Sequence, residues 1–396
     1  MKLFSSVIFL FSLFNTYAQH GDVPLLERGI TLQTENIPIE DLLRNISAQA
    51  DFVFSYNPEV ISHIHPLSLN VSNKPVRLVL NQIFKDGKVE YKVKGKYVIL
   101  KRSGAVDSNK DNRLFEGYVY DSRTGKKLTQ ASVYDKTLLA SAITDKYGYF
   151  SMELPANTPI NSLQISKIGY ADTLVISPDS VLKNRSLEIQ LVQEDTIRKI
   201  PNFDFLKFKP GWLVPEKLKI NAENITEPVF KSFQISLIPY LSTNKLLGGV
   251  AINDFSINAT VGYVQGVRIF EAGGMLNYVR NDVSYFQAAG VGNFVGGNVT
   301  GFQAAGVFNF AQDVLGFQAA GVFNQINSIK GTQFAGVYNL VKEDANVQFA
   351  GIFNKSENSA IQTAGLFNKS ASSPVQIAGL FKPYPKYRFS DIRFPK

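Results

Sequence analysis

The sequence predicts a multidomain, mainly β protein in which a small α+β module and a β-sandwich precede a C-terminal β-repeat region. Three observations lead to this prediction. The chain has 396 residues, which is enough for two or three domains. Short segments that alternate apolar and polar residues outnumber helical patterns. A unit of 14–16 residues recurs eight times toward the C-terminus.

The composition excludes several classes of function. The chain has no cysteine and only 3 histidines, His20, His63 and His65. Without cysteine there is no disulfide, thiol nucleophile, thiolate zinc site or lipoprotein anchor. The formal charge is +8 at pH 7, but the basic residues are scattered, so we expect no nucleic-acid partner. We predict a protein that is not an enzyme and that has no catalytic residue, no cofactor and no metal ligand.

Residues 1–18 predict a secretory signal peptide. Lys2 precedes an apolar run over 3–14, and Ala18 offers a small residue at the cleavage point. The run is shorter than the roughly 20 residues that a membrane-spanning helix needs. We therefore expect the chain to be exported, and no other segment is predicted to be a membrane helix.

Residues 20–104 are predicted to form the α+β module. Apolar residues recur at helical spacing after Pro38 and again after Pro75. Strand-like segments surround both helices, so the element order is β-α-β-β-α-β-β. We interpret His63 and His65 as ordinary loop residues, because two ligands alone are a weak metal signal.

This order is carried by the segments IPIEDLLRNISAQADFVFSYNPEV, LSLNVSNKPVRLVLNQIF and YKVKGKYVILKR. With them, the module resembles the secretin and TonB short N-terminal domain (STN domain). The resemblance implies a periplasmic docking or signalling module without catalytic residues. Its implied partner is another envelope protein, such as a membrane-bound anti-sigma-type regulator.

A polar linker at 103–113 separates this module from a predicted β-sandwich at 114–193. Six or seven short strands with turn signals between them favour two packed sheets. The motifs GYVYD at 117–121 and TDKYGYF at 144–150 resemble those of the carboxypeptidase regulatory-like domain. The resemblance implies an accessory, transthyretin-like sandwich. No histidine follows His65, so a histidine-ligated zinc peptidase site is excluded.

A proline-containing connector at 194–230 leads to the repeat region at 231–396, whose clearest copies read GFQAAGVFN. Each copy holds a glutamine, a glycine three residues later and, in all but the last, an asparagine three residues after that. The first copy has Glu271 in place of the glutamine. The predicted structural positions are Gln287, Gln303, Gln318, Gln333, Gln348, Gln362 and Gln376; Gly290, Gly306, Gly321, Gly336, Gly351, Gly365 and Gly379; and Asn293, Asn309, Asn324, Asn339, Asn354 and Asn368.

Two architectures are open for the repeat. We interpret each unit as one strand of eight or nine residues, with Phe302 and Phe308 on one face and Gln303 and Asn309 on the other. In a parallel β-solenoid, equal positions stack about 4.8 Å apart, so amides and rings form ladders. In a transmembrane β-barrel, the same alternation would place aromatic residues at both membrane interfaces. Uniform connections and the same polarity in every copy favour the solenoid. The units also resemble the glutamine-glycine-asparagine surface repeats of exported proteins in diderm bacteria.

These modules together predict a non-enzymatic cell-envelope protein of a diderm bacterium, in the periplasm or at the outer membrane or cell surface. The N-terminal module would dock a partner, the sandwich would act as a spacer, and the repeat would provide a binding or surface scaffold. The alternative is an outer-membrane β-barrel anchor or transporter component with a periplasmic signalling domain.

Overall fold

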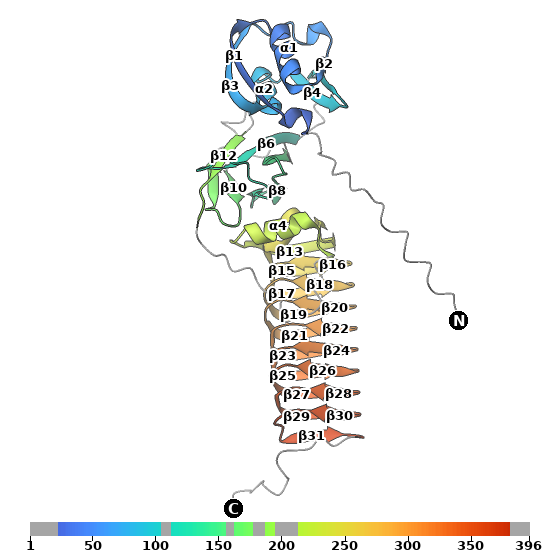
Figure 1. The fold of residues 1–396 in the computed structure, drawn as a ribbon. Coiled ribbons are helices and arrows are strands. Elements are labelled where there is room, and N and C mark those ends of the chain that lie inside the picture. Colours follow the sequence, from blue (N-terminus) through green and yellow to red (C-terminus); the bar gives the residue numbers. More distant parts are fainter. Residues whose placement is uncertain (1–22, 104–111, 156–161, 177–186, 195–212, 381–396) are drawn as a thin grey trace, which may run out of the picture. The chain divides into compact units, whose positions relative to one another are not determined.

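The computed structural model describes residues 23–103, 112–155, 162–176, 187–194 and 213–380 (Figure 1). The predicted signal peptide, most of the linker and the first part of the connector lie outside these ranges. The described residues form two compact units, one up to residue 103 and one from residue 112 onward. Within these ranges, no helix combines the length and the apolar character that crossing a membrane requires.

The first unit is an α+β module with the predicted element order. Pro38 and Pro75 lie directly before its two helices, with φ values of −57° and −55° that lead into the first turn. Strand β1 pairs antiparallel with β3, and β5 lies between β2 and β4. The elements are β1 (Gly29–Ile37), α1 (Ile39–Ala50), β2 (Val53–Ser55), β3 (Leu67–Pro75), α2 (Val76–Ile83), β4 (Val89–Lys94) and β5 (Tyr97–Arg102), with short 3-10 turns at Leu25–Glu27 and Pro58–Val60.

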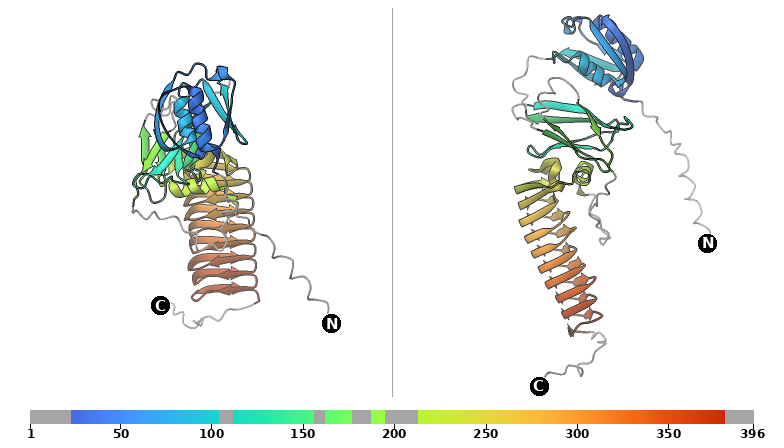
Figure 2. Two further views of the ribbon diagram at one scale, coloured as in Figure 1. Left: turned by 45° about the horizontal axis from the view of Figure 1, so that its top comes forward. Right: turned by 90° about the vertical axis from the view of Figure 1, so that its left-hand side faces the viewer.

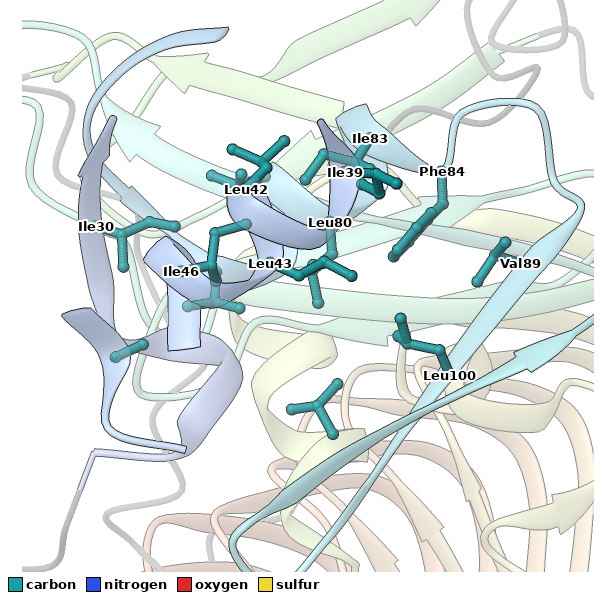
Figure 3. Close-up of a cluster of buried hydrophobic side chains, with 14 of the residues drawn as sticks. Ile30, Ile39, Leu42, Leu43, Ile46, Leu80, Ile83, Phe84, Val89 and Leu100 are labelled. Atoms are coloured by element: carbon teal, nitrogen blue, oxygen red, sulfur yellow. The ribbon is translucent and has the colours of Figure 1, made fainter. Parts of the chain in front are cut away.

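The apolar faces of the two helices form the core of this unit (Figure 3). Leu42 and Ile46 of α1 and Leu80 of α2 are all fully buried. Burial of such a side chain stabilises a fold by about 1.5–3 kcal/mol. The helical spacing that is visible in the sequence therefore corresponds to the packed face.

The second unit begins with a β-sandwich of a four-stranded sheet, in the order β11-β10-β7-β8, and a three-stranded sheet, in the order β12-β6-β9. Asp145 shapes the hairpin before β9, since its carboxylate accepts hydrogen bonds from the backbone N–H groups of Tyr147 and Tyr149. Phe150 then points into the core and is 1% exposed. The strands are β6 (Asn112–Asp121), β7 (Ser132–Asp135), β8 (Ala140–Ile143), β9 (Tyr149–Pro155), β10 (Ser162–Ser166), β11 (Thr173–Ile176) and β12 (Leu187–Leu191).

The repeat region is a parallel β-solenoid, as predicted, and not an antiparallel barrel (Figures 1 and 2). Its larger sheet contains β14 (Leu241–Ser242), β13 (Val229–Ile238), β15 (Ala251–Asn258), β17 (Gly266–Gly273), β19 (Val283–Ala289), β21 (Val299–Ala305), β23 (Asp313–Ala320), β25 (Ser328–Ala335), β27 (Asp344–Ala350), β29 (Asn358–Ala364) and β31 (Val375–Ala378). Its smaller sheet contains β16 (Val261–Val264), β18 (Leu276–Val279), β20 (Gly292–Val295), β22 (Phe308–Phe310), β24 (Phe323–Ile326), β26 (Tyr338–Val341), β28 (Phe353–Lys355) and β30 (Phe367–Lys369).

The structure corrects the interpretation of each unit as a single strand. In the unit that contains Gln303, β21 has 7 residues and belongs to the larger sheet, whereas β22 has 3 residues and belongs to the smaller one. The chain turns a corner between them, at Gly306. Phe302 and Phe308 therefore lie on different sheets and not on one face, although both are only partly buried.

The solenoid also begins earlier than the sequence repeat. Strands β13 and β15 precede the first copy, yet they stack in parallel on β17 in the larger sheet. Helix α4 (Glu216–Asn224), in the proline-containing connector, packs with the 3-10 helix at Lys245–Val250 at the N-terminal end of the stack. Leu218 of α4 and Tyr263 of β16 share a buried cluster there.

Candidate functional site

The predicted glutamines form one continuous buried ladder inside the larger sheet. Each Gln side chain from Gln287 to Gln362 is 0% exposed. Its Nε2 donates to the Oε1 of the preceding glutamine, as from Gln318 to Gln303 at 2.6 Å and from Gln333 to Gln318 at 2.7 Å. The donors therefore all point toward the N-terminal coils. The last member, Gln376, donates to Gln362 at 3.0 Å and is half-buried.

The asparagines form a second ladder, inside the smaller sheet, with the opposite polarity. The Nδ2 of Asn309 donates to the Oδ1 of Asn324 at 2.8 Å, and Asn324 donates to Asn339 at 2.9 Å. These donors point toward the C-terminal coils. Because the two rows of amide dipoles run in opposite directions, their fields along the solenoid axis oppose each other. The second N–H of each asparagine is also used, as from Asn324 to the carbonyl oxygen of Phe334 at 2.6 Å.

The predicted glycines form a column at the corner between the two sheets. A Cβ atom on Gly321 would lie 2.0 Å from the carbonyl oxygen of Gly306, and one on Gly336 would lie 2.0 Å from that of Gly321. Any larger residue would therefore point at the backbone of the preceding coil. The column is a condition for stacking the coils, and it offers no side chain to a ligand.

Glu271 occupies the end of the glutamine ladder and has a role that the sequence did not reveal. Its carboxylate accepts hydrogen bonds from Gln287 Nε2 at 2.7 Å, Asn258 Nδ2 at 2.9 Å and Ser256 Oγ at 3.2 Å. Donors thus reach this position from both sides. A glutamine here would turn one N–H group toward another donor, whereas a carboxylate accepts from both sides.

Burial raises the pKa of Glu271 to about 7, from 4.5 for an ordinary glutamate, although its three hydrogen bonds oppose the rise. The folded state therefore binds a proton more tightly than the unfolded state. This contribution to stability is complete below about pH 4.5 and is lost as the pH rises through about 7. A shift of this size corresponds to about 3 kcal/mol.

Glu271→Gln removes this titration. We expect the free energy of unfolding of the variant, relative to the unaltered chain, to rise by about 3 kcal/mol between pH 4.5 and pH 8. Urea denaturation followed by circular dichroism at several pH values measures this difference. Glu343→Gln, at an exposed position of the solenoid, is the control and should show no such change. A Glu271→Gln difference that is constant with pH would contradict the expectation.

The residues that face outward are the ones that the sequence reasoning did not select. Phe286, Phe302 and Phe317 stack on the outer face of the larger sheet, with ring centroids 5.3 and 5.1 Å apart and ring planes within 7°. Phe353 and Phe367 stack in the same way on the smaller sheet, with centroids 5.1 Å apart. The sequence showed that these aromatic residues recur periodically. It did not show which residues beside them also lie on the outer faces of the sheets.

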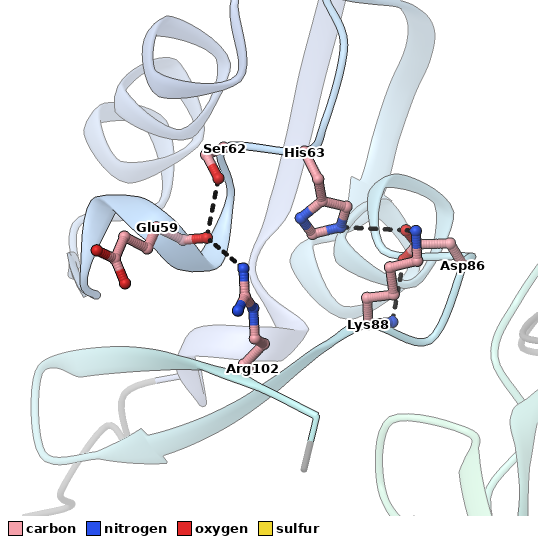
Figure 4. A network of polar contacts seen from close by, with 6 residues as sticks. All are labelled: Glu59, Ser62, His63, Asp86, Lys88 and Arg102. Atoms are coloured by element: carbon pink, nitrogen blue, oxygen red, sulfur yellow. Dashed lines mark hydrogen bonds and ion pairs between the residues drawn. The ribbon is translucent and has the colours of Figure 1, made fainter. Parts of the chain in front are cut away.

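His63 belongs to a polar network that holds a loop of the first unit in place (Figure 4). Its Nε2 lies 3.2 Å from Asp86 Oδ2, in the turn after α2. The Arg102 guanidinium donates to the carbonyl oxygen of Glu59 at 3.4 Å, and the Ser62 hydroxyl donates to the same oxygen at 3.1 Å. Among the residues that the structure describes, no group of three or more histidine, aspartate or glutamate side chains could hold a metal ion.

Comparison with known proteins identifies a family that matches the second module. The sequence model of a family described as "CarboxypepD_reg-like domain" matches residues 115–198, which covers the β-sandwich. No curated protein and no solved structure matches the chain. The second module is therefore similar to the carboxypeptidase regulatory-like domain, in agreement with the motifs at 117–121 and 144–150.

Proposed function

We propose that this chain is a non-enzymatic scaffold of the bacterial cell envelope. Residues 1–18 would direct its export, and the first unit would act as an STN-like docking module. The sandwich would join that module to the solenoid, whose outer faces would present an extended surface. The proposal includes location in the periplasm or at the outer membrane or cell surface, without a cofactor or nucleic-acid partner.

One observation carries the proposal: the polar side chains that recur in the solenoid form hydrogen bonds to one another in its buried ladders. Gln303, for example, is fully buried, donates to Gln287 at 2.8 Å and accepts from Gln318 at 2.6 Å. A fully buried amide whose oxygen and nitrogen both form hydrogen bonds inside the stack is not accessible to a substrate. The most regular feature of the sequence therefore supports a structural role and not a reaction.

The junction between the sandwich and the solenoid supports a spacer role for the sandwich. Asn224, at the end of α4, donates from Nδ2 to the carbonyl oxygen of Gln130 at 2.7 Å and to Ser132 Oγ at 3.0 Å. Tyr134 of β7 packs in a buried cluster with Val229 and Leu247 at the start of the solenoid. Buried apolar and polar contacts of this kind hold the sandwich against the start of the solenoid, as a spacer role requires.

The first unit offers an apolar edge for a partner. Val53 of β2 and Tyr97 of β5 are register partners, and they are 54% and 52% exposed. Strand β2 is an edge strand of its sheet, with backbone groups that a partner strand can extend. We propose that an envelope protein, such as an anti-sigma-type regulator, binds at this edge.

Affinity purification from envelope fractions of a diderm bacterium that produces the full chain tests both parts of the proposal. We expect the chain in the envelope fraction, and we expect an envelope partner that Tyr97→Glu removes. Gln33→Glu, exposed on the other sheet of the same unit, should retain the partner. Recovery of the chain only from the cytoplasm would overturn the location, and equal recovery of the partner with both variants would overturn the proposed edge.

A further inference from the structure

The outer face of the larger sheet carries a long and mostly apolar stripe. The stripe runs over the ten strands of the larger sheet from β13 to β31. We define it as the residue directly before and the residue directly after the ladder position in each of these strands. It begins with Phe233 and Ile235 and ends with Val375 and Ile377. These residues form two straight columns, because the strands pair in register. All of them are apolar except Thr332 and Thr363. Phe233 is 46% exposed and Ile377 is 58% exposed, so the stripe reaches solvent at both ends.

The size of the stripe matches that of an interface between proteins. Ten strands spaced about 4.8 Å apart make it about 43 Å long, and two columns of side chains make it about 12 Å wide, or roughly 500 Å². A third column of register partners lies beside the stripe and contains Leu315, which is 55% exposed. The same column contains the polar residues Thr300 and Lys330, which form a rim. Two such stripes together bury roughly 1,000 Å², which is the lower limit for a specific interface, and one stripe is about as large as the largest patch on a typical monomer.

The relief of the stripe is complementary to itself. Phe302 in the first column lies beside Ala304 in the second, and the same pairing holds for Phe286 with Ala288 and for Phe317 with Ala319. In the next two coils the bulky residue changes column: Phe334 lies beside Thr332, and Phe349 beside Val347. Each of these levels therefore has one large and one smaller residue.

A two-fold axis parallel to the solenoid and between the two columns would use this relief at each of these five levels. Such an axis places the first column of one copy opposite the second column of the other copy, at the same height. Phe302 would then face Ala304 of the other copy, and Phe334 would face Thr332. Stacking of the rings holds each ridge stiff, so less side-chain entropy is lost on association.

We propose that a second copy of this chain occupies the stripe, so that two solenoids pack side by side and parallel through their larger sheets. The stripe carries no charged residue, so it offers nothing for charge complementarity with a charged partner. The outer face of the smaller sheet differs, since Lys355 and Lys369 continue the column of Gln325 there. The uncharged, self-complementary face is the one that suits a copy of itself.

Sedimentation equilibrium of the full chain tests the proposal, with Ala304→Arg as the variant and Gln325→Arg as the matched control on the smaller sheet. We expect the unaltered chain and Gln325→Arg to form dimers, and Ala304→Arg to weaken dimerisation at least about 30-fold, because it buries an unpaired charge. Circular dichroism checks that each variant is folded, and Thr332→Arg replaces Ala304→Arg if the latter is not. A monomeric unaltered chain, or equal dimerisation of all three, would overturn the proposal. If the unaltered chain is monomeric and binds phosphatidylcholine vesicles through the same face, a lipid surface is the occupant instead.

Spin labels test the parallel arrangement independently, because the chain has no cysteine of its own. Ser232→Cys and Ala360→Cys place single exposed labels near opposite ends of the stripe. Two parallel copies predict label separations below about 30 Å for both variants, whereas antiparallel copies predict about 40 Å from the length of the stripe. Long separations for both variants would overturn the same-level pairing.

Discussion

Asn324→Asp is expected to lower the free energy of unfolding of the solenoid by about 3–5 kcal/mol at pH 7, because it creates an unpaired buried charge. Asn324 is fully buried, and its Nδ2 donates to Asn339 Oδ1 and to the carbonyl oxygen of Phe334. Aspartate has nearly the same shape but would turn an oxygen toward these two acceptors. It keeps only the hydrogen bond that Asn309 donates, at 2.8 Å.

The loss should depend on pH. Protonation of the new carboxyl restores one donor, so the folded state raises its pKa above the unfolded value of about 4. The variant should therefore regain stability as the pH falls toward 4 and lose it as the pH rises. Urea denaturation at pH 4.5 and pH 7 measures the change. Asn346→Asp, at an exposed position of β27, should stay within about 0.5 kcal/mol of the unaltered chain. Equal effects of the two variants would refute the importance of the ladder.

Gly321→Ala is expected to cost about 3 kcal/mol or more, at the upper end of what overpacking does. The added methyl group would lie 2.0 Å from the carbonyl oxygen of Gly306 and 3.1 Å from its carbon. These are backbone atoms in a hydrogen-bonded stack, in which Gly321 N donates to the carbonyl oxygen of Ala305 at 3.1 Å. The neighbouring coil therefore cannot move away without breaking its own pairing.

Hydrogen exchange followed by mass spectrometry locates this effect, because it reports the coils separately from the other modules. We expect faster exchange in the coils around residues 306–336. The control is Gly125→Ala, in a turn of the sandwich where the added Cβ would have no neighbour within 4 Å. Its φ of +66° limits the expected cost to about 1–2 kcal/mol, and only in the sandwich. Unchanged exchange in the coils of Gly321→Ala would contradict the role assigned to the glycine column.

The sequence predicted more of the fold than of the surface. Pro38 and Pro75 marked the beginnings of both helices, because a proline fixes φ locally. The motif at 144–150 forms a hairpin turn, in which Asp145 bonds to backbone groups only two and four residues away. These features depend on short-range contacts and can be read from neighbouring residues.

The candidate site was predicted only in part. The recurring glutamines, glycines and asparagines identified the positions that stack, and the parallel pairing places each on its equivalent. They were buried rather than available to a ligand, and the exposed columns on either side of the glutamines had not been selected. The sequence showed Glu271 only as a replacement for the glutamine in the first copy. Its role depends on Ser256 and Asn258, which lie outside the recognised copies.

The sequence by itself determined that a unit of 14–16 residues recurs with one polarity, and this regularity favoured a parallel solenoid over a membrane barrel. The parallel pairing of the strands in the structure decided between the two. Only the tertiary structure decided where each unit turns and which residues face outward. One strand of nine residues and two short strands joined at a corner show the same alternation of apolar and polar residues. The alternation therefore cannot distinguish the two arrangements. The corner at Gly306 is set by the backbone of the coils before and after it, at distances that no local pattern contains.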